Sequence, residues 1–402
     1  NGLEKRPKLR FPGFDEPYRS TQLGGIASLV NRTDPKSNAP IMMLSAGNGF
    51  IMQSEKYSRD NAGQSLKKYI LLKQGELAYN HGASKAKQFG CCYELTEPEA
   101  RIPYVYHCFK INDHEYTPYI AMALNNAKMD KQLKRLVSSS VRMDGLLNIS
   151  FEDYMSVTLY LPPFNEQKRI ADFLQKFDER IAAQEKLLAS LKKYKRGVMQ
   201  HIFHQRYTQV DEVWTCVRLG DIFKKVSRRN TDGMVKNVIT NSAEYGLIPQ
   251  RDFFDKDIAV DGNTANYYVI EEGNFVYNPR KSNTAPYGPF NRYTLSERGI
   301  ISPLYTCLVL QSDINPSYLA WYFRSDAWHR YIYDNGSQGV RHDRVSMTDD
   351  LLMGIPVMFP DHATQQVYAD MLDKVESRLQ AAQKEYELLI KLKDGYVQQL
   401  FI

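Results

Sequence analysis

The sequence predicts an α+β protein in which two mixed α/β globular units are joined by a long antiparallel two-helix coiled coil, with an internal two-fold pseudo-repeat. Two observations carry this prediction. One segment of the chain recurs at an offset of 198 residues, and both copies have the apolar pattern of a helix that pairs with another helix. The length of 402 residues is sufficient for two domains that each bury a core.

The repeat is clearest in two helix-like segments. Residues 162–203 align without a gap with residues 360–401, and 15 of the 42 aligned positions are identical. Two short matches extend the repeat upstream: LGGI at 23–26 matches LGDI at 219–222, and GELAYN at 75–80 matches GNFVYN at 273–278. The predicted order along the chain is therefore globular unit, helix, globular unit, helix.

Both helix-like segments carry a heptad pattern, in which mostly apolar residues recur at alternating spacings of four and three. Such a stripe covers one face of a helix and stays exposed to water unless a second helix packs against it. The seam positions are Ile170, Leu174, Phe177, Ile181, Gln184, Leu188, Leu191, Lys195, Val198 and Ile202 in the first segment, and Tyr368, Leu372, Val375, Leu379, Ala382, Tyr386, Leu389, Lys393, Tyr396 and Leu400 in the second.

The order of the segments predicts that the two helices are antiparallel. The first helix leaves the first unit and enters the second, whereas the second helix starts at the second unit and turns back. About 33 residues at ~1.5 Å per residue give ~50 Å, so the pair would act as a spacer between the units. The alternative is a helical hairpin buried in one core, and the many Lys and Glu residues outside the seam favour the exposed pair.

The globular units combine short strand-like runs with helix-like runs. Tyr, Asn and Arg gather in Gly- and Pro-containing stretches at 277–293 and 335–344, which is typical of loops. The strand-like runs are 104–111, 267–270, 274–277 and 304–310, and a helix-like run covers 316–332.

Charge is distributed unevenly along the chain. The formal net charge of +6 is too small by itself to identify a nucleic-acid-binding protein. Residues 1–164 and 165–206 each carry +5, whereas residues 207–360 and 361–402 each carry −2. If a polyanion binds, we expect the first half to lead the attraction and the second half to depend on local arginines.

Composition argues against several classes of protein. No window approaches the roughly 18 uninterrupted apolar residues of a spanning helix, and the charged start NGLEKRPKLR lacks the apolar segment of a signal peptide. The five cysteines are odd in number and form no CxxC motif, which indicates neither a disulfide framework nor a zinc site. We expect a soluble cytoplasmic protein in a reducing compartment, without metal and without membrane contact.

Several motifs together resemble the specificity subunits of type I restriction-modification systems. They are PKLRFPGF at 7–14, the two LG-[GD]-I starts, the two strand ends in Tyr-Asn, LPPFNEQKRIADFL at 161–174, ISPLYTCLVL at 301–310 and LKDGYVQQLF at 392–401. The resemblance covers nearly the whole chain. It departs at DHATQQ (361–366), where only Gln365 is kept from the pattern Asn165-Glu166-Gln167.

The resemblance implies a non-catalytic subunit that recognises double-stranded DNA at a bipartite site. Target-recognition domain 1 would span 1–163, the central spacer helix 164–206, target-recognition domain 2 207–360 and the C-terminal spacer helix 361–402. Methyltransferase (M) and restriction/translocase (R) subunits would assemble around the chain. The chain itself would bind no cofactor, because S-adenosylmethionine, ATP and Mg²⁺ belong to those partner subunits.

The candidate DNA-reading residues are polar and basic side chains on loops, because Arg, Asn and Gln can recognise base edges while Lys holds phosphates. They are Asn80, His81, Lys85, Lys87 and Arg142 in the first unit, and Asn278, Arg280, Lys281, Asn283, Tyr287, Arg341, His342 and Arg344 in the second. The resemblance also implies that partner subunits dock on the helical segments, at Glu166, Gln167, Arg169, Gly197 and Gln200.

The alternative is a DNA-modifying enzyme, a fused methyltransferase or nuclease with an unusual motif. An adenine methyltransferase needs an Asn or Asp before Pro-Pro-aromatic to hold the flipped base, but here Leu161 precedes Pro162-Pro163-Phe164. Glu166-Gln167-Lys168 has the acid-x-lysine spacing of a metal-dependent nuclease without a suitable upstream acid. A protein-only coiled-coil adaptor would explain the seam but not the duplicated, loop-rich units.

Overall fold

The computed structural model describes residues 6–56, 63–85, 87–137, 147–204, 214–252, 264–336 and 343–402. The chain forms two compact units. Unit 1 consists of Asn1–Glu185 with Lys384–Ile402, and unit 2 consists of Lys186–Gln383. Each unit therefore combines one globular part with one part of each of the two long helices. The predicted division into four segments stays a prediction.

Unit 1 is built around a four-stranded antiparallel sheet in the order β2-β9-β6-β7. Three antiparallel pairs surround it: β1 with β10, β3 with β4 and β5 with β8. The strands are β1 Arg19–Gln22, β2 Ala27–Leu29, β3 Met42–Ser45, β4 Gly49–Met52, β5 Ile70–Lys73, β6 Leu77–Asn80, β7 Cys91–Glu94, β8 Glu99–Ile102, β9 His107–Ile111 and β10 Thr158–Leu161.

Short helices cover this sheet and close its core. The helices are α1 Gln53–Lys56, α2 Thr117–Leu124, α3 Ala127–Leu136 and α4 Phe151–Met155, with 3₁₀ turns at Leu23–Gly25 and Gly63–Lys68. The aromatic rings of Tyr79 and Tyr154 stack at 3.8 Å in the centre, and Phe109 and Tyr119 are fully buried beside them. Asn126 caps α3 by accepting bonds from the backbone of Lys128 and Met129.

Unit 2 repeats this topology strand by strand. Its four-stranded sheet has the order β12-β19-β16-β17, and its pairs are β11 with β20, β13 with β14 and β15 with β18. The strands are β11 Thr215–Arg218, β12 Phe223–Lys225, β13 Ile239–Ser242, β14 Gly246–Pro249, β15 Tyr268–Ile270, β16 Phe275–Tyr277, β17 Phe290–Arg292, β18 Gly299–Ile301, β19 Thr306–Leu310 and β20 Pro356–Phe359. The predicted internal repeat is thus present in the fold.

The helix-like run at 316–332 forms two helices rather than one. The helices of unit 2 outside the long pair are α6 Leu219–Ile222, α7 Pro316–Arg324, α8 His329–Asn335 and α9 Asp349–Met353, with a 3₁₀ turn at Gln250–Asp252. Ser325 ends α7, because its hydroxyl bonds to the carbonyl of Tyr322 at 2.6 Å and also accepts a bond from the backbone of Ala327. The break lets Trp328 turn into the core.

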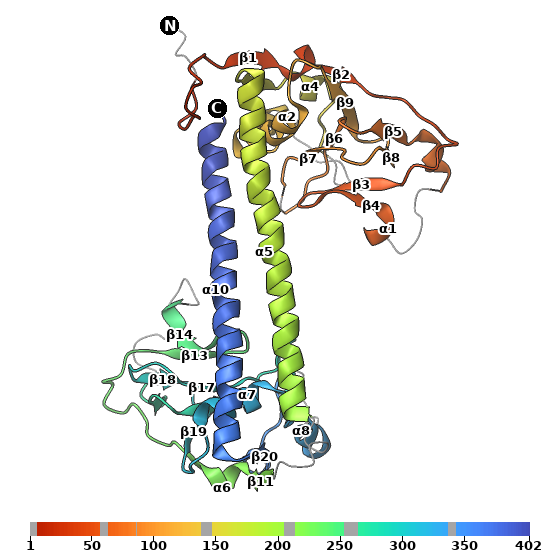
Figure 1. Ribbon diagram of the computed structural model, residues 1–402. Coiled ribbons are helices and arrows are strands. Elements are labelled where there is room, and N and C mark those ends of the chain that lie inside the picture. Colours follow the sequence, from red (N-terminus) through yellow and green to blue (C-terminus); the bar gives the residue numbers. More distant parts are fainter. Residues whose placement is uncertain are drawn as a thin grey trace. The chain divides into compact units, whose positions relative to one another are not determined.

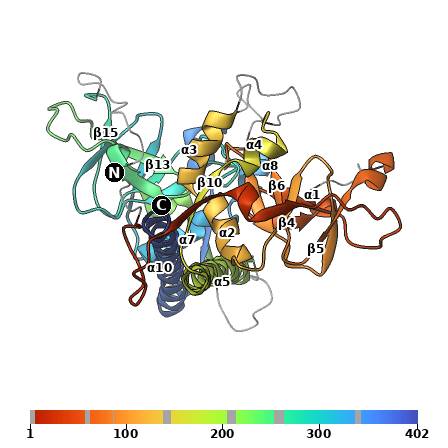
Figure 2. The ribbon, with the colours of Figure 1, turned by 90° about the horizontal axis from the view of Figure 1, so that it is seen from above.

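The two long helices are α5, Phe164–His204, and α10, His362–Leu400. In unit 1, Phe173 and Phe177 of α5 pack against Tyr396 of α10, and Arg180 pairs with Glu385 at 2.7 Å. The residue number falls along α10 as it rises along α5, so the helices are antiparallel. Figures 1 and 2 show them side by side.

The predicted seam is confirmed. Every predicted seam residue is buried or half-buried in both helices. Gln184 and Lys195 are the polar members in α5, and Lys195 is neutralised there by Glu376 of α10 at 2.6 Å. Among the residues that the structure describes, no helix has the length and apolar character needed to cross a membrane.

Two neighbouring leucines test the helix pair. Leu188 lies on the seam with 6% of its surface exposed, whereas Leu187 is 46% exposed on the outer face. Leu188→Ala should lower the free energy of unfolding by about 2–4 kcal/mol, because it leaves a cavity between the helices. Leu187→Ala should change it by less than about 0.5 kcal/mol. Chemical denaturation followed by circular dichroism measures both values, and equal losses would contradict the seam.

Candidate nucleic-acid interface

The same set of residues frames one loop in each unit. A Tyr-Asn pair lies at the end of both β6 and β16, with Asn80 the last residue of β6 and Asn278 directly after β16, and the tyrosine hydroxyl reaches across the following loop to a backbone carbonyl. Tyr79 donates to Phe89 at 2.6 Å, and Tyr277 donates to Tyr287 at 2.7 Å. Burial raises the pKa of both tyrosines, which keeps their hydroxyl groups neutral and able to donate.

The asparagines shape the start of each loop, and glycines close its end. The side-chain oxygen of Asn80 accepts a bond from the backbone of Gly82 at 2.9 Å, and that of Asn278 accepts one from Arg280 at 3.0 Å. Gly288 has a φ of +85°, and a Cβ there would lie 2.0 Å from the carbonyl oxygen of Asn278. Gly90 occupies the equivalent position in unit 1. We call residues 81–89 and 279–287 the framed loops.

The framed loop of unit 2 pairs with the chain around Arg344. The backbone of Lys281 donates to Asp343 at 2.9 Å, and Arg280 forms an isolated antiparallel bridge with Arg344. This pairing brings together two loop segments that the sequence places more than 60 residues apart. The side chains of Arg280, Lys281 and Asn283 are exposed, and Arg344 is half-buried with its Nε 3.7 Å from Asp343.

Two other predicted readers of unit 2 are partly used inside the unit. The side chain of Asn278 is buried, and its amide nitrogen donates to the carbonyl of Asn241 at 3.3 Å. The half-buried ring of Tyr287 lies 4.8 Å from that of His329. The side chain of Asn278 therefore supports the conformation of the framed loop from within the unit.

The predicted readers of unit 1 differ in accessibility. His81 is buried, and its ring nitrogens lie 2.8 Å from the carbonyl of Leu147 and 2.9 Å from that of Val105. Lys87 donates to the carbonyl of Asn125 at the end of α2, at 2.7 Å. Lys85 is exposed on the framed loop. The predicted residues Arg142, Arg341 and His342 lie outside the described residues.

A buried asparagine network supports the framed loop of unit 2. Asn291 of β17 donates to the side chain of Asn241 of β13 at 2.7 Å, and Asn241 donates to the carbonyl of Val276 at 2.9 Å. Neither asparagine belongs to the repeated motifs, so no sequence pattern predicted this network. Asn80 and Asn278 were predicted to read DNA, although the recurrence of Tyr-Asn in both units was the available signal for a loop-shaping role.

Among the predicted docking residues, Glu166 and Gln167 are buried at the start of α5. Both Glu166 oxygens accept bonds from Arg10, at 2.9 and 2.8 Å, and Tyr18 donates to the same carboxylate. Gln167 accepts a bond from the backbone of Tyr116 at 2.9 Å. Their side chains are thus fully used within unit 1.

The other three predicted docking residues are exposed. Arg169 covers the ring of Phe11 at 5.3 Å, while Gly197 and Gln200 lie on the outer surface of α5 in unit 2. A Cβ added at Gly197 would meet nothing within 4 Å. Next to it runs a groove between the two helices, lined by Tyr194 and Val198 of α5 and Met371 of α10.

A segment of unit 1 that includes the framed loop matches a known protein family. Residues 59–193 match the family described as "Type I restriction modification DNA specificity domain". This match contains the whole of the framed loop 81–89.

Two solved structures are similar over nearly the full length. One is a chain from a study of complex assembly and conformational transition of the type I R-M system, with a TM-score of 0.52, 15% identity and 98% of each chain covered. The other is the S subunit of a type I restriction-modification system from M. genitalium, with a TM-score of 0.59, 14% identity and 99% of each chain covered. At these identities the likeness shows a shared fold.

The family match and the shared fold confirm the resemblance that the motifs predicted. Residues 59–193 match the family of type I restriction-modification DNA specificity domains, and the chain shares the fold of an S subunit over nearly its whole length.

Proposed function

We propose that this chain is the sequence-specific DNA-recognition subunit of a cytoplasmic type I restriction-modification enzyme, reading a bipartite site and scaffolding the M and R subunits. One observation carries the proposal. The framed loop of the DNA specificity domain recurs in unit 2, on the same sheet topology and with the same tyrosine, asparagine and glycine positions. Two copies of one recognition unit suit a target made of two half-sites.

The exposed side chains of the framed loops have the chemistry that base reading needs. Arginine recognises guanine through a bidentate contact and asparagine recognises adenine, while lysine holds phosphates. Arg280, Lys281 and Asn283 are available for these contacts, and within the described residues neither cation has an ion-pair partner. In unit 1 the corresponding exposed cation is Lys85. His81 and Asn278 hold the loops in shape.

Catalysis, in this proposal, belongs to the partner subunits together with S-adenosylmethionine, ATP and Mg²⁺. The local structure supports this assignment. Pro162-Pro163 forms the connection from β10 to α5, and the Pro162 carbonyl accepts a bond from Gln167. The Glu166 carboxylate, which the nuclease hypothesis requires for a metal, is buried against Arg10. Both motifs therefore serve the start of a helix.

Docking of the M subunits is proposed for the exposed surfaces of α5 around Arg169, Gly197 and Gln200. The absence of a side chain at Gly197 opens the helix surface beside the groove of Tyr194 and Met371. A glycine inside a helix costs about 1 kcal/mol relative to alanine, so its presence here suits close approach by another chain. Glu166 and Gln167 would act only by positioning α5.

Methylome sequencing tests the function directly. Cells without DNA methylation would carry this chain with its M subunit, the M subunit alone, or this chain alone. We expect a split motif with adenine methylated in both halves only when both chains are present. Methylation by this chain alone would establish the alternative enzyme, and an unchanged pattern from a soluble, active complex would contradict the proposal.

Arg280→Ala tests base reading by the framed loop of unit 2. Loss of a bidentate contact should reduce discrimination at one half-site by about 1–3 kcal/mol without unfolding the protein. The control is Arg298→Ala in the same unit, because Arg298 is already paired with Glu271 at 2.8 Å and should change binding by less than about 0.5 kcal/mol. Competition binding with single-base variants of the target measures both, and full discrimination by Arg280→Ala would show that another residue reads the base.

Gly197→Glu tests docking. The added side chain meets open space, so folding should be unaffected, but its bulk and charge should weaken binding of the M subunit at least about tenfold. Gly197→Ala is the matched control, which should raise helix stability by up to about 1 kcal/mol and keep the partner. Sedimentation of the mixed subunits measures binding. Equal affinities for both variants would place the docking surface elsewhere.

A further inference from the structure

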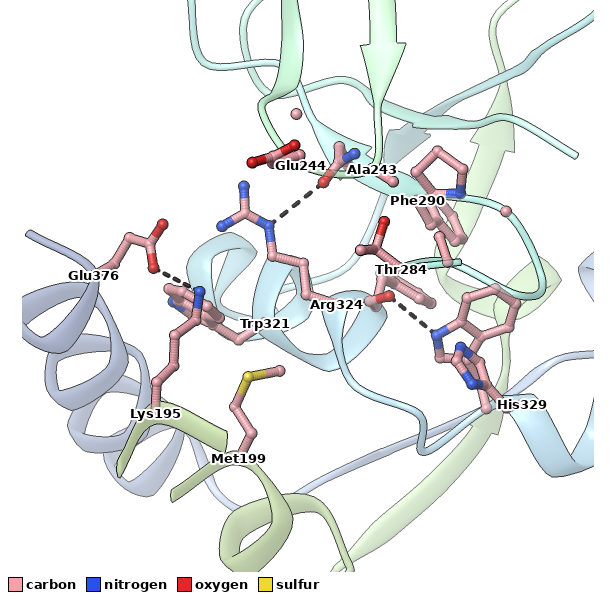
Figure 3. A pocket seen from close by; sticks show the side chains of 17 residues that line it. Lys195, Met199, Ala243, Glu244, Thr284, Phe290, Trp321, Arg324, His329 and Glu376 are labelled. Atoms are coloured by element: carbon pink, nitrogen blue, oxygen red, sulfur yellow. Dashed lines mark hydrogen bonds and ion pairs between the residues drawn. The ribbon is translucent and has the colours of Figure 1, made fainter. Parts of the chain in front are cut away.

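Unit 2 contains a polar hollow that none of the predicted residues explains. Its volume is about 180 Å³, and it lies between α5, the turn from β13 to β14, the end of α7 and the second half of the framed loop (Figure 3). Lys195 and Met199 come from α5, Glu244 from the turn, Thr284 from the framed loop and Arg324 from α7. The hollow therefore adjoins the loop that is proposed to read DNA.

Arg324 is held rigidly within this hollow. Its Nε lies 3.4 Å from the side-chain oxygen of Asn291, and its guanidinium lies 5.1 Å from the ring of Trp321. Both supports are fixed in turn: Asn291 by its bond to Asn241, and Trp321 by a 2.7 Å bond from its indole nitrogen to Asp373. The side chain is thus pre-organised, and Figure 3 shows it extended into the hollow.

Of the basic side chains that line the hollow, Arg324 is the one left to bind an anion. Lys195 is paired with Glu376 at 2.6 Å, and burial lowers the pKa of His329, which favours its neutral form. Within the described residues, neither Arg324 nor Glu244 has an ion-pair partner. An anion entering the hollow would therefore meet one free guanidinium and one opposing carboxylate.

A similar hollow occurs in unit 1. Its volume is about 320 Å³, and it also lies between the framed loop, the end of the helix equivalent to α7, and a long helix. Val397 of α10 lines it where the aligned Met199 of α5 lines the hollow of unit 2. Its cations are Lys87 of the loop and Lys128 of α3, which donate to the carbonyls of Asn125 and Phe401, and the carboxylates of Asp130 and Asp394 also line it. The recurrence of a basic side chain beside both framed loops points to a shared ligand.

We propose that the hollow of unit 2 is a phosphate-binding site, in which the terminal nitrogens of Arg324 hold one phosphodiester group of the bound DNA. Phosphate oxygens project from the surface of a duplex and can enter a small hollow, whereas a paired base presents only its edge within a groove. A planar guanidinium with two free nitrogens fits two phosphate oxygens at once. The proposal rests on the proposed function and adds a contact that positions the duplex against the framed loop.

The salt dependence of binding tests this contact. Each phosphate contact contributes about 0.9 to the slope of log K against log salt. Arg324→Ala in the full chain should therefore lower the slope by about 0.9 and weaken binding about eightfold at 0.1 M salt, equally for the target duplex and a scrambled duplex. Arg324→Lys keeps the charge and should keep the slope. Arg330→Ala is the control, because Arg330 is exposed and already paired with Asp334.

Glu244→Gln separates a phosphate from a base at this site. Removing the opposing carboxylate should tighten binding if a phosphate enters, since the repulsion is lost. It should weaken binding if Glu244 instead accepts a bond from a cytosine amino group. Tighter binding by Glu244→Gln together with a lower slope for Arg324→Ala supports the site. An unchanged slope, a loss confined to the target duplex, or an equal slope change in Arg330→Ala overturns it.

Failure of this inference is distinguishable from failure of the proposed function. The unaltered chain is measured first on the target and scrambled duplexes, and absence of discrimination by it would contradict the recognition function itself. Discrimination by the unaltered chain with no effect of Arg324→Ala would overturn only the phosphate site. Thermal unfolding of each variant identifies any that fails to fold. If Arg324→Ala does not fold, Arg324→Lys is compared with the unaltered chain, because lysine keeps the charge and the salt slope but lacks the bidentate fork.

Discussion

A buried glutamine amide at the start of each long helix is the joint on which the rest of each unit depends. Gln167 accepts a bond from the backbone of Tyr116 and donates to the carbonyl of Pro162, and Gln365 makes the same two bonds with Asn315 and Pro360 at 2.8 and 2.9 Å. Both amides are almost fully buried, so each lost bond would leave a backbone group unsatisfied. The amide thereby fixes the last strand, the start of the long helix and the segment before α2 or α7.

Around this shared joint the two units use different charges. In unit 1, Gln167 also bonds to Glu115 at 2.6 Å, and the adjacent Glu166 binds Arg10. In unit 2, Thr364 takes the aligned position of Glu166, and Asp361 caps α10 by accepting bonds from the backbone of Ala363 and Thr364. The departure of DHATQQ from the first copy therefore replaces the buried Arg10–Glu166 pair with a side-chain helix cap, and the glutamine amide is retained.

The fold was largely predictable because its signals are local or repeated. A heptad seam and a 198-residue offset are visible in the sequence, and both describe backbone and packing directly. The roles of single polar residues were less accessible. His81 is held by carbonyls 24 and 66 positions away, and Glu166 is held by Arg10, 156 positions away. No local pattern encodes such partners, so exposed and buried polar residues looked alike.

The framed loops separate the residues that hold the loop ends from the residues that differ between the two units. Tyrosine, asparagine and glycine hold both loop ends in the same way, yet the residues between them differ: GASKAKQF at 82–89 and RKSNTAPY at 280–287. The frame residues are buried or half-buried, and the two glycines have a positive φ that other residues rarely adopt, whereas the loop side chains are mostly exposed and contribute little to stability. Loop shape and loop chemistry thus depend on different residues of one short segment, which allows each unit to change the exposed side chains without changing the frame.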